Sequence, residues 1–279
     1  MTAGTQHLLT EIRETLQQGQ KDLAAKYLAQ PDHKAYLSGR SQLVDQMLTR
    51  LWEAAHLPKS AALIAVGGYG RGELYPYSDI DVLIALENPP SPEIETALER
   101  LISQFWDIGL AIGHSVRTID ESIGAAASDI TVQTALYESR LICGQAKLQK
   151  ILHQRITDSM VADQFIAAKL AEQEERHLRF AFSAFSLEPN CKESPGGLRD
   201  IHSLNWIAQA AGFGTHTDAW QALQKQALMQ GDERVALERA AGFLADLRIR
   251  LHLLTGRAED RLLFDVQGQI AQQFGFTDI

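Results

Sequence analysis

Apolar side chains recur over much of this chain with the three-to-four-residue spacing of amphipathic helices. The spacing predicts helices at 5–29, 34–56 and 92–107, the last with Ser91 as a suitable N-cap and Pro92 at its first position. Short apolar runs without this spacing are predicted to be buried strands, at residues 63–66, 79–86 and 111–118.

The helical pattern dominates the second half of the chain, with predicted segments at 129–143, 146–158, 161–184, 198–211, 217–229 and 232–255. Because the strands gather in one part, the pattern predicts an α+β fold, with a small sheet flanked by helices and then an all-helical domain. We expect N-terminal helices at 1–58 that pack on the sheet, a sheet-containing domain at 59–150 and a helical domain at 151–279.

Composition narrows the class of protein. The formal net charge of −9 argues against a scaffold that binds nucleic acid by neutralising phosphates. The N-terminus lacks the apolar core of a signal peptide, and no apolar run is long enough to cross a bilayer. Two cysteines without metal spacing fit a reducing compartment. We therefore expect a soluble cytoplasmic protein with neither a nucleic-acid nor a membrane partner.

Candidate chemistry lies in the stretch AALIAVGGYGRGELYPYSDIDVLIAL, residues 61–86. Asp79 and Asp81 are two positions apart, so a strand would place both carboxylates on one face. Adjacent carboxylates repel each other unless a cation lies between them. Mg²⁺ suits this pair, because it binds through one or two carboxylates and leaves room for substrate phosphates.

The glycine-rich segment before the aspartates supplies the second half of this hypothesis. It is not a Walker A loop, since no Gly-Lys-Ser/Thr follows, and Glu73 stands where a dinucleotide fingerprint needs its last glycine. Glycines after a strand more often make only a tight turn. The combination is more informative, because Gly67 and Gly68 let backbone N–H groups approach the phosphates that a metal on Asp79 and Asp81 would bridge.

This combination resembles the signature of the DNA polymerase β-type nucleotidyltransferases, and the matching residues are Gly67, Gly68, Arg71, Gly72, Ser78, Asp79 and Asp81. Three further segments, 113–118, 187–208 and 251–271, resemble bacterial protein-PII uridylyltransferases. The resemblance implies transfer of UMP from UTP to a tyrosine of the PII signal protein in nitrogen regulation, with release of pyrophosphate. It also implies Mg²⁺ on Asp79 and Asp81, and phosphates held by Gly67, Gly68 and Ser78 with help from Arg71.

A second candidate site lies in the segment NCKESPGGLRD. The Pro-Gly-Gly turn at 195–197 is expected to start a helix and to present free N–H groups to an anion. An ordinary helix start with Arg199 and Asp200 paired in solvent is the alternative. The family resemblance favours nucleotide contact through Lys192 and Arg199.

The chain departs from the family pattern in two ways. The strand AIGHSVRT lacks the third carboxylate of the superfamily, and Ala111, His114 and Ser115 stand at the candidate positions. His114 could act as a general base, although a histidine held by structural hydrogen bonds is the more common case. The chain also contains no His-Asp dipeptide, so the family's UMP-removing and glutamine-sensing functions are expected to be absent.

Two alternatives stay open at this point. The same fold could use another nucleotide or acceptor, as adenylyltransferases do, because nothing in the sequence identifies the base. A non-catalytic module that binds nucleotide or a PII-like partner is the other, favoured by the missing third acid and disfavoured by the intact Asp79 and Asp81 pair.

Overall fold

The computed structural model describes residues 3–183, 186–215 and 218–277. The chain forms two compact units, Met1–Leu74 with Ser78–Ser159 and Tyr75–Tyr77 with Met160–Ile279. Residues 184 and 217, where two of the predicted helices end and begin, lie outside the described residues.

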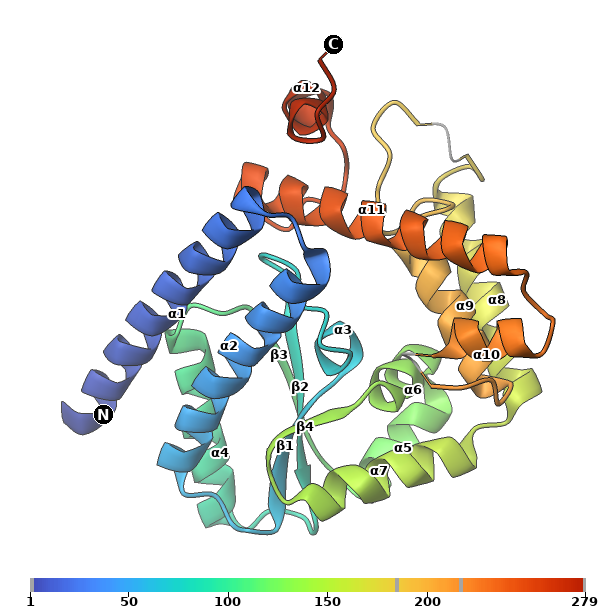
Figure 1. The fold of residues 1–279 in the computed structure, drawn as a ribbon. Coiled ribbons are helices and arrows are strands. Elements are labelled where there is room, and N and C mark those ends of the chain that lie inside the picture. The colour runs from blue at the N-terminus through green and yellow to red at the C-terminus, as the bar shows by residue number, and fades with distance from the viewer. Residues whose placement is uncertain (1–2, 184–185, 216–217, 278–279) are drawn as a thin grey trace. The chain divides into compact units, whose positions relative to one another are not determined.

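The first unit is built on a four-stranded mixed sheet of order β3-β2-β1-β4 (Figure 1). β1 is antiparallel to both of its neighbours, whereas β2 and β3 run parallel. The strands are β1 (Ala61–Ala65), β2 (Ile80–Leu86), β3 (Ile112–Thr118) and β4 (Arg140–Gly144). The predicted α+β class, a small sheet flanked by helices, is confirmed.

Helices cover both faces of this sheet (Figure 1). One face packs on α1 (Ala3–Ala29), α2 (His33–Ala55) and α4 (Pro92–Asp107), whose apolar stripes share a core with every second residue of β2. The other face packs on α5 (Ile119–Ser128), α6 (Ile130–Tyr137) and α7 (Ala146–Ser159). Both faces of β2 are buried against helices, which explains why its sequence is a nearly continuous run of apolar residues.

The helix predicted at 129–143 is wrong in its second half. α6 ends at Tyr137, and Arg140–Gly144 is the edge strand β4, which pairs with β1. Gly144 has a φ of +90°, and a Cβ there would lie 2.6 Å from the carbonyl oxygen of Ala61. The short apolar run at 141–143 carries no helical period of its own, so pairing with β1 decides its structure.

The second unit is helical in its described residues: α8 (Ala162–Arg179), α9 (Leu198–Ala210), α10 (Ala219–Lys225), α11 (Gly231–Thr255) and α12 (Phe264–Gln273). Its core includes Leu247, Leu251 and Ile270 around the buried Cys191. An isolated bridge between Asn190 and Arg261 ties the loop before α9 to the segment after α11. Among the residues described in either unit, no helix combines the length and the apolar character needed to cross a membrane.

Candidate active site

The glycine segment and the aspartates lie together where β1 ends and β2 begins. β1 runs antiparallel to β2, so the end of β1 lies beside the start of β2. The N–H of Val66 donates to the carbonyl of Asp81 at 3.1 Å, and α3 (Gly67–Gly70) begins at the next residue. The first N–H groups of a helix have no partner within it. The N–H groups of Gly67 and Gly68, at the start of α3, therefore lie next to β2, the strand that carries Asp81.

Asp81 is the second residue of β2, and Asp79 directly precedes that strand. Both are exposed, whereas Ile80 between them is fully buried. Asp81 lies beside Gly113 in the parallel register of β2 and β3. A Cβ on Gly113 would lie only 2.4 Å from Oδ1 of Asp81, so the carboxylate occupies the space that the glycine leaves.

His114 does not face this carboxylate. In the same register it lies beside Val82, which belongs to the core on the α4 face of the sheet. Its ring packs edge-to-face against Trp106 of α4, with the centroids 5.9 Å apart. Because successive strand residues point to opposite faces, His114 lies on the face opposite Asp81. The structure thus contradicts His114 as a general base for chemistry at Asp81.

The register of β2 and β3 also places the candidate positions of the third acid. Gly113, and neither Ala111 nor His114, lies beside Asp81, while Ser115 is one pleat further along β3. Within the described part of the chain, no cluster of three or more His, Cys, Asp or Glu side chains could hold a metal. The carboxylates of Asp79 and Asp81 beside the glycine segment still fit Mg²⁺, which usually completes its coordination shell with water and substrate phosphates.

Ser78 has a feature that points to a ligand. Its Oγ is buried and has no hydrogen-bond partner among the described residues. A buried polar group without a partner costs about 1–3 kcal/mol. A phosphate oxygen or metal-bound water beside Asp79 could supply that partner.

Tyr69 anchors α3 from within the glycine segment. Its hydroxyl donates to Asp45 of α2 at 2.5 Å, and Arg140 donates to both oxygens of Asp45, at 2.7 and 3.1 Å. Burial, and then the charge of Asp45, raises the pKa of Tyr69 well above its usual value. The uncharged Tyr69 side chain therefore fixes the position of α3 through its hydrogen bond to Asp45.

Arg71 also points into the unit. Its side chain is 8% exposed and forms ion pairs with Glu73 at 2.9 Å and with Glu138 at 2.6 Å. Next to it, a Cβ on Gly70 would lie 1.9 Å from the carbonyl oxygen of Glu138, so only glycine fits there. These contacts give Arg71 a role in holding the loop, in addition to its predicted role toward phosphate.

The sequence patterns did not indicate that Asp45 and Gly113 lie at this site. Asp45 lies on a helix more than 20 positions from the loop, so no local pattern could have linked them. Gly113 did carry a signal, because an isolated glycine inside a strand often marks a close approach of another group.

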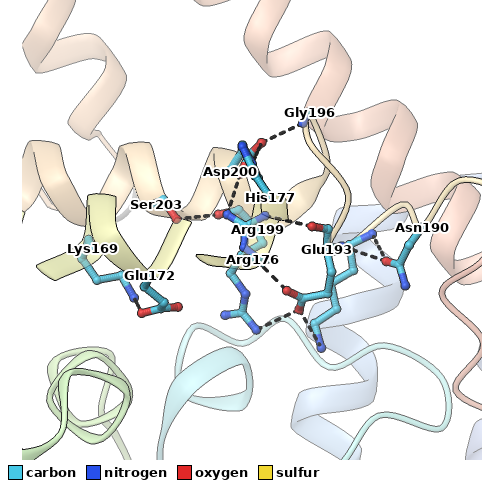
Figure 2. A network of polar contacts seen from close by, with 11 residues as sticks. Lys169, Glu172, Arg176, His177, Asn190, Glu193, Gly196, Arg199, Asp200 and Ser203 are labelled. Carbon is cyan, nitrogen blue, oxygen red and sulfur yellow. Dashed lines mark hydrogen bonds and ion pairs between the residues drawn. The ribbon is translucent and has the colours of Figure 1, made fainter. Parts of the chain in front are cut away.

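Lys192 and Arg199 lie in the second unit, where both meet Glu193. Arg199 is 3.2 Å and Lys192 3.7 Å from Oε1 of that carboxylate, and Figure 2 shows the network around it. Burial, followed by the charges of Arg248 and Arg199, lowers the pKa of Lys192. The structure thus brings these two predicted residues together, on a carboxylate.

The helix start at α9 does not present the free N–H groups that we expected. The N–H groups of Gly197, Leu198 and Arg199 donate to carbonyls of the preceding loop at 2.8–2.9 Å. The N–H of Gly196 donates to Asp200 at 2.7 Å (Figure 2). This turn is internally satisfied, so an anion there must be held by side chains.

Asp200 is the centre of the network in Figure 2. It accepts hydrogen bonds from Arg176 at 2.6 Å and from His177 at 3.0 Å. Burial alone would raise the pKa of Asp200, but the hydrogen bonds from Arg176, Gly196 and His177 outweigh it and hold the pKa below its usual value. Asp200 therefore fixes the turn rather than pairing in solvent.

Comparisons with known proteins agree with this geometry. Residues 48–113 match the nucleotidyltransferase domain, a range that includes α3, Asp79 and Asp81. Residues 164–279 match the family described as GlnD PII-uridylyltransferase, a range that includes Lys192 and Arg199.

Curated relatives extend the similarity to nearly the whole chain. Bifunctional uridylyltransferase/uridylyl-removing enzymes from Aromatoleum aromaticum and Chromobacterium violaceum are 45% and 46% identical over 98% and 97% of the chain. The chain spans 31% of the length of each relative. These matches confirm the resemblance found in the sequence to nucleotidyltransferases and to protein-PII uridylyltransferases.

Proposed function

We propose that this chain, a homologue of the GlnD PII-uridylyltransferases, transfers UMP from UTP to a tyrosine hydroxyl of a PII signal protein and releases pyrophosphate. The observation that carries the proposal is the placement of the glycine segment beside the aspartates. The hydrogen bond from Val66 to Asp81 links the two halves of the site. The names of the relatives, which the chain matches over nearly its full length, support uridylyl transfer.

Asp79 and Asp81 would hold Mg²⁺ in this proposal. Both carboxylates are exposed, and the space over Gly113 lets that of Asp81 lie against the sheet. When bound, Mg²⁺ neutralises charge on the phosphates and on the leaving pyrophosphate. Because the protein contributes only two acids in the described residues, the remaining ligands would be water and UTP oxygens.

The triphosphate would be held by groups of the first unit. The backbone N–H groups of Gly67 and Gly68 begin at the sheet edge, and the unpartnered Oγ of Ser78 lies next to Asp79. Within the second unit, Lys192 and Arg199 stay predicted nucleotide contacts, and each would have to exchange its present carboxylate partner, Glu193, for the nucleotide.

The attacking group is a phenol, which lowers the demand for a general base. A tyrosine hydroxyl has a pKa of about 10, far below that of an aliphatic alcohol, so loss of its proton needs less help. Catalysis would therefore come mainly from positioning and charge neutralisation. This accounts for a site in which the described residues supply no third acid.

Two other functions remain as alternatives. The same site could transfer another nucleotide, or act on another acceptor. A non-catalytic module that only binds is the second alternative, because binding alone would also need no third acid among the described residues. To separate them, we would incubate the chain with Mg²⁺, PII and labelled UTP, ATP, CTP or GTP in turn. Label on PII from UTP alone supports the proposal, label from ATP identifies an adenylyltransferase, and nucleotide binding without label indicates the module.

A further inference from the structure

The three residues before Ser78 belong to the second unit, although the residues on both sides of them belong to the first. Tyr75 is 3% exposed and Pro76 is buried, whereas Tyr77 is exposed. Tyr77 also has a φ of +57°, a left-handed conformation that is unfavourable for a bulky residue. Such a conformation persists only where the surroundings fix the chain.

α11 supplies the groups that fix this segment. The guanidinium of Arg248 lies 4.1 Å from the centroid of the Tyr75 ring, and the ring of His252 meets Tyr75 edge-to-face. Nδ1 of His252 is hydrogen-bonded to the carbonyl oxygen of Pro76. A carbonyl oxygen can only accept, so this nitrogen carries the proton.

Asp260 holds His252 and Arg248 in turn. It lies 2.9 Å from Nε2 of His252 and accepts from Nε of Arg248 at 2.7 Å. Burial alone would raise the pKa of Asp260, but the hydrogen bonds and charges of His252 and Arg248 hold it well below its usual value. Asp260 thus contacts His252 and Arg248, the two α11 side chains that meet Tyr75. His252 is fully buried and cannot reach a substrate.

We propose that His252 is a positioning residue that fixes Ser78 and Asp79 for metal–nucleotide binding through its hydrogen bond to the Pro76 carbonyl. Pro76 is two residues from Ser78 and three from Asp79, so freeing its carbonyl releases the backbone that carries both. The inference rests on the proposed function, since it assumes that Asp79 binds the metal. It assigns to α11 a role in the site that neither the sequence motif nor the relatives' names indicate.

Two amide substitutions, which differ in side-chain length, separate this role from general packing. His252→Asn places an amide nitrogen near the position of Nδ1 and can still donate to Pro76. His252→Gln places its amide near Nε2 and keeps only the contact with Asp260. Leu251→Ala removes a fully buried side chain from the core of α11 and serves as the control for lost stability.

The measurement is Mn²⁺ binding by electron paramagnetic resonance, with a non-hydrolysable UTP analogue, on the 279-residue chain. Thermal unfolding of each variant is recorded alongside. Groups that orient metal ligands typically change metal affinity about 10–100-fold. We expect His252→Gln to weaken Mn²⁺ binding by about tenfold or more, and His252→Asn and Leu251→Ala to stay within about threefold of wild type.

The outcomes distinguish the two claims. Wild-type affinity in His252→Gln overturns the positioning role, as does weakening that follows lost stability equally in all three variants. If the wild-type chain binds no Mn²⁺ with the analogue, the proposed function fails and this inference fails with it. If only His252→Gln is weakened, both stand.

Discussion

Gly113→Ala is the substitution that tests the metal site with the least disturbance of the fold. The new Cβ would lie 2.4 Å from Oδ1 of Asp81, and ordinary contact begins near 3.4 Å, so the carboxylate must move by about 1 Å. Mg²⁺ demands near-ideal geometry at about 2.0–2.1 Å. A misplacement of about 1 Å can reduce a reaction ~10²-fold, and we expect a loss of that size in UMP transfer.

The fold should tolerate the same change. Gly113 lies inside β3, and the atom that its new Cβ meets is the end of an exposed side chain, which can rotate. Alanine is about 0.5–1 kcal/mol more favourable than glycine in a strand, so the free energy of unfolding should stay level or rise slightly. Activity and stability are thus predicted to change in opposite directions.

The assay combines transfer of labelled UMP to PII with urea unfolding followed by circular dichroism. Gly124→Ala is the matched control, because this glycine lies in α5 with no atom within 4 Å of its Cβ position. The control should transfer UMP at the wild-type rate. Wild-type transfer by Gly113→Ala would refute the placement of the metal on Asp81, and an unfolded variant would refute the estimate of the fold's tolerance.

Three further predictions follow from the buried polar groups. Arg71→Met should lower the free energy of unfolding, measured in urea, by about 3–5 kcal/mol, because it leaves Glu138, whose side chain is 3% exposed, without its ion pair to Arg71. The double variant Arg71→Met with Glu138→Leu should regain part of that loss. Asp200→Asn should cost about 1.5–3 kcal/mol at pH 7. Because folding lowers the pKa of Asp200, its contribution to stability is present above the unfolded pKa of about 3.9 and is lost as the pH falls through the folded pKa. The difference in unfolding free energy between Asp200→Asn and wild type should therefore narrow below about pH 4. A difference that widened there would contradict the lowered pKa. Burial raises the pKa of Cys143 to about 11 and of Cys191 to about 12. At pH 8, iodoacetamide should therefore alkylate Cys143 on the order of 100-fold more slowly than it alkylates a free thiol, and Cys191 more slowly still. Rapid native-state labelling of Cys191 in a peptide map would show that it is not buried as described.

Local patterns predicted the runs that form β1, β2 and β3, because each depends on neighbours in the sequence. The alternation around Ile80 indicates a strand whether or not β3 lies beside it. β4 was missed because its identity depends on pairing with β1, far away in the chain. Its five residues are too short to show a period of their own.

The site could be predicted only in part for a similar reason. Asp79, Asp81 and the glycines are visible as a motif, but the register of β2 and β3 decides which residue lies beside Asp81. Reading the strand alone made His114 a candidate, and the register places Gly113 there. His252 could not have been linked to this site, because it lies far from the motif in the sequence and its contact is with a backbone carbonyl.

The central claim is that the carboxylate of Asp81 supports UMP transfer. The most direct test is to incubate wild type and Asp81→Asn with labelled UTP, Mg²⁺ and PII, and to count label on the PII tyrosine. Asp81 is exposed, so the substitution should leave thermal unfolding unchanged. We predict label with wild type and almost none with Asp81→Asn. Near-normal labelling by a folded Asp81→Asn would contradict the account.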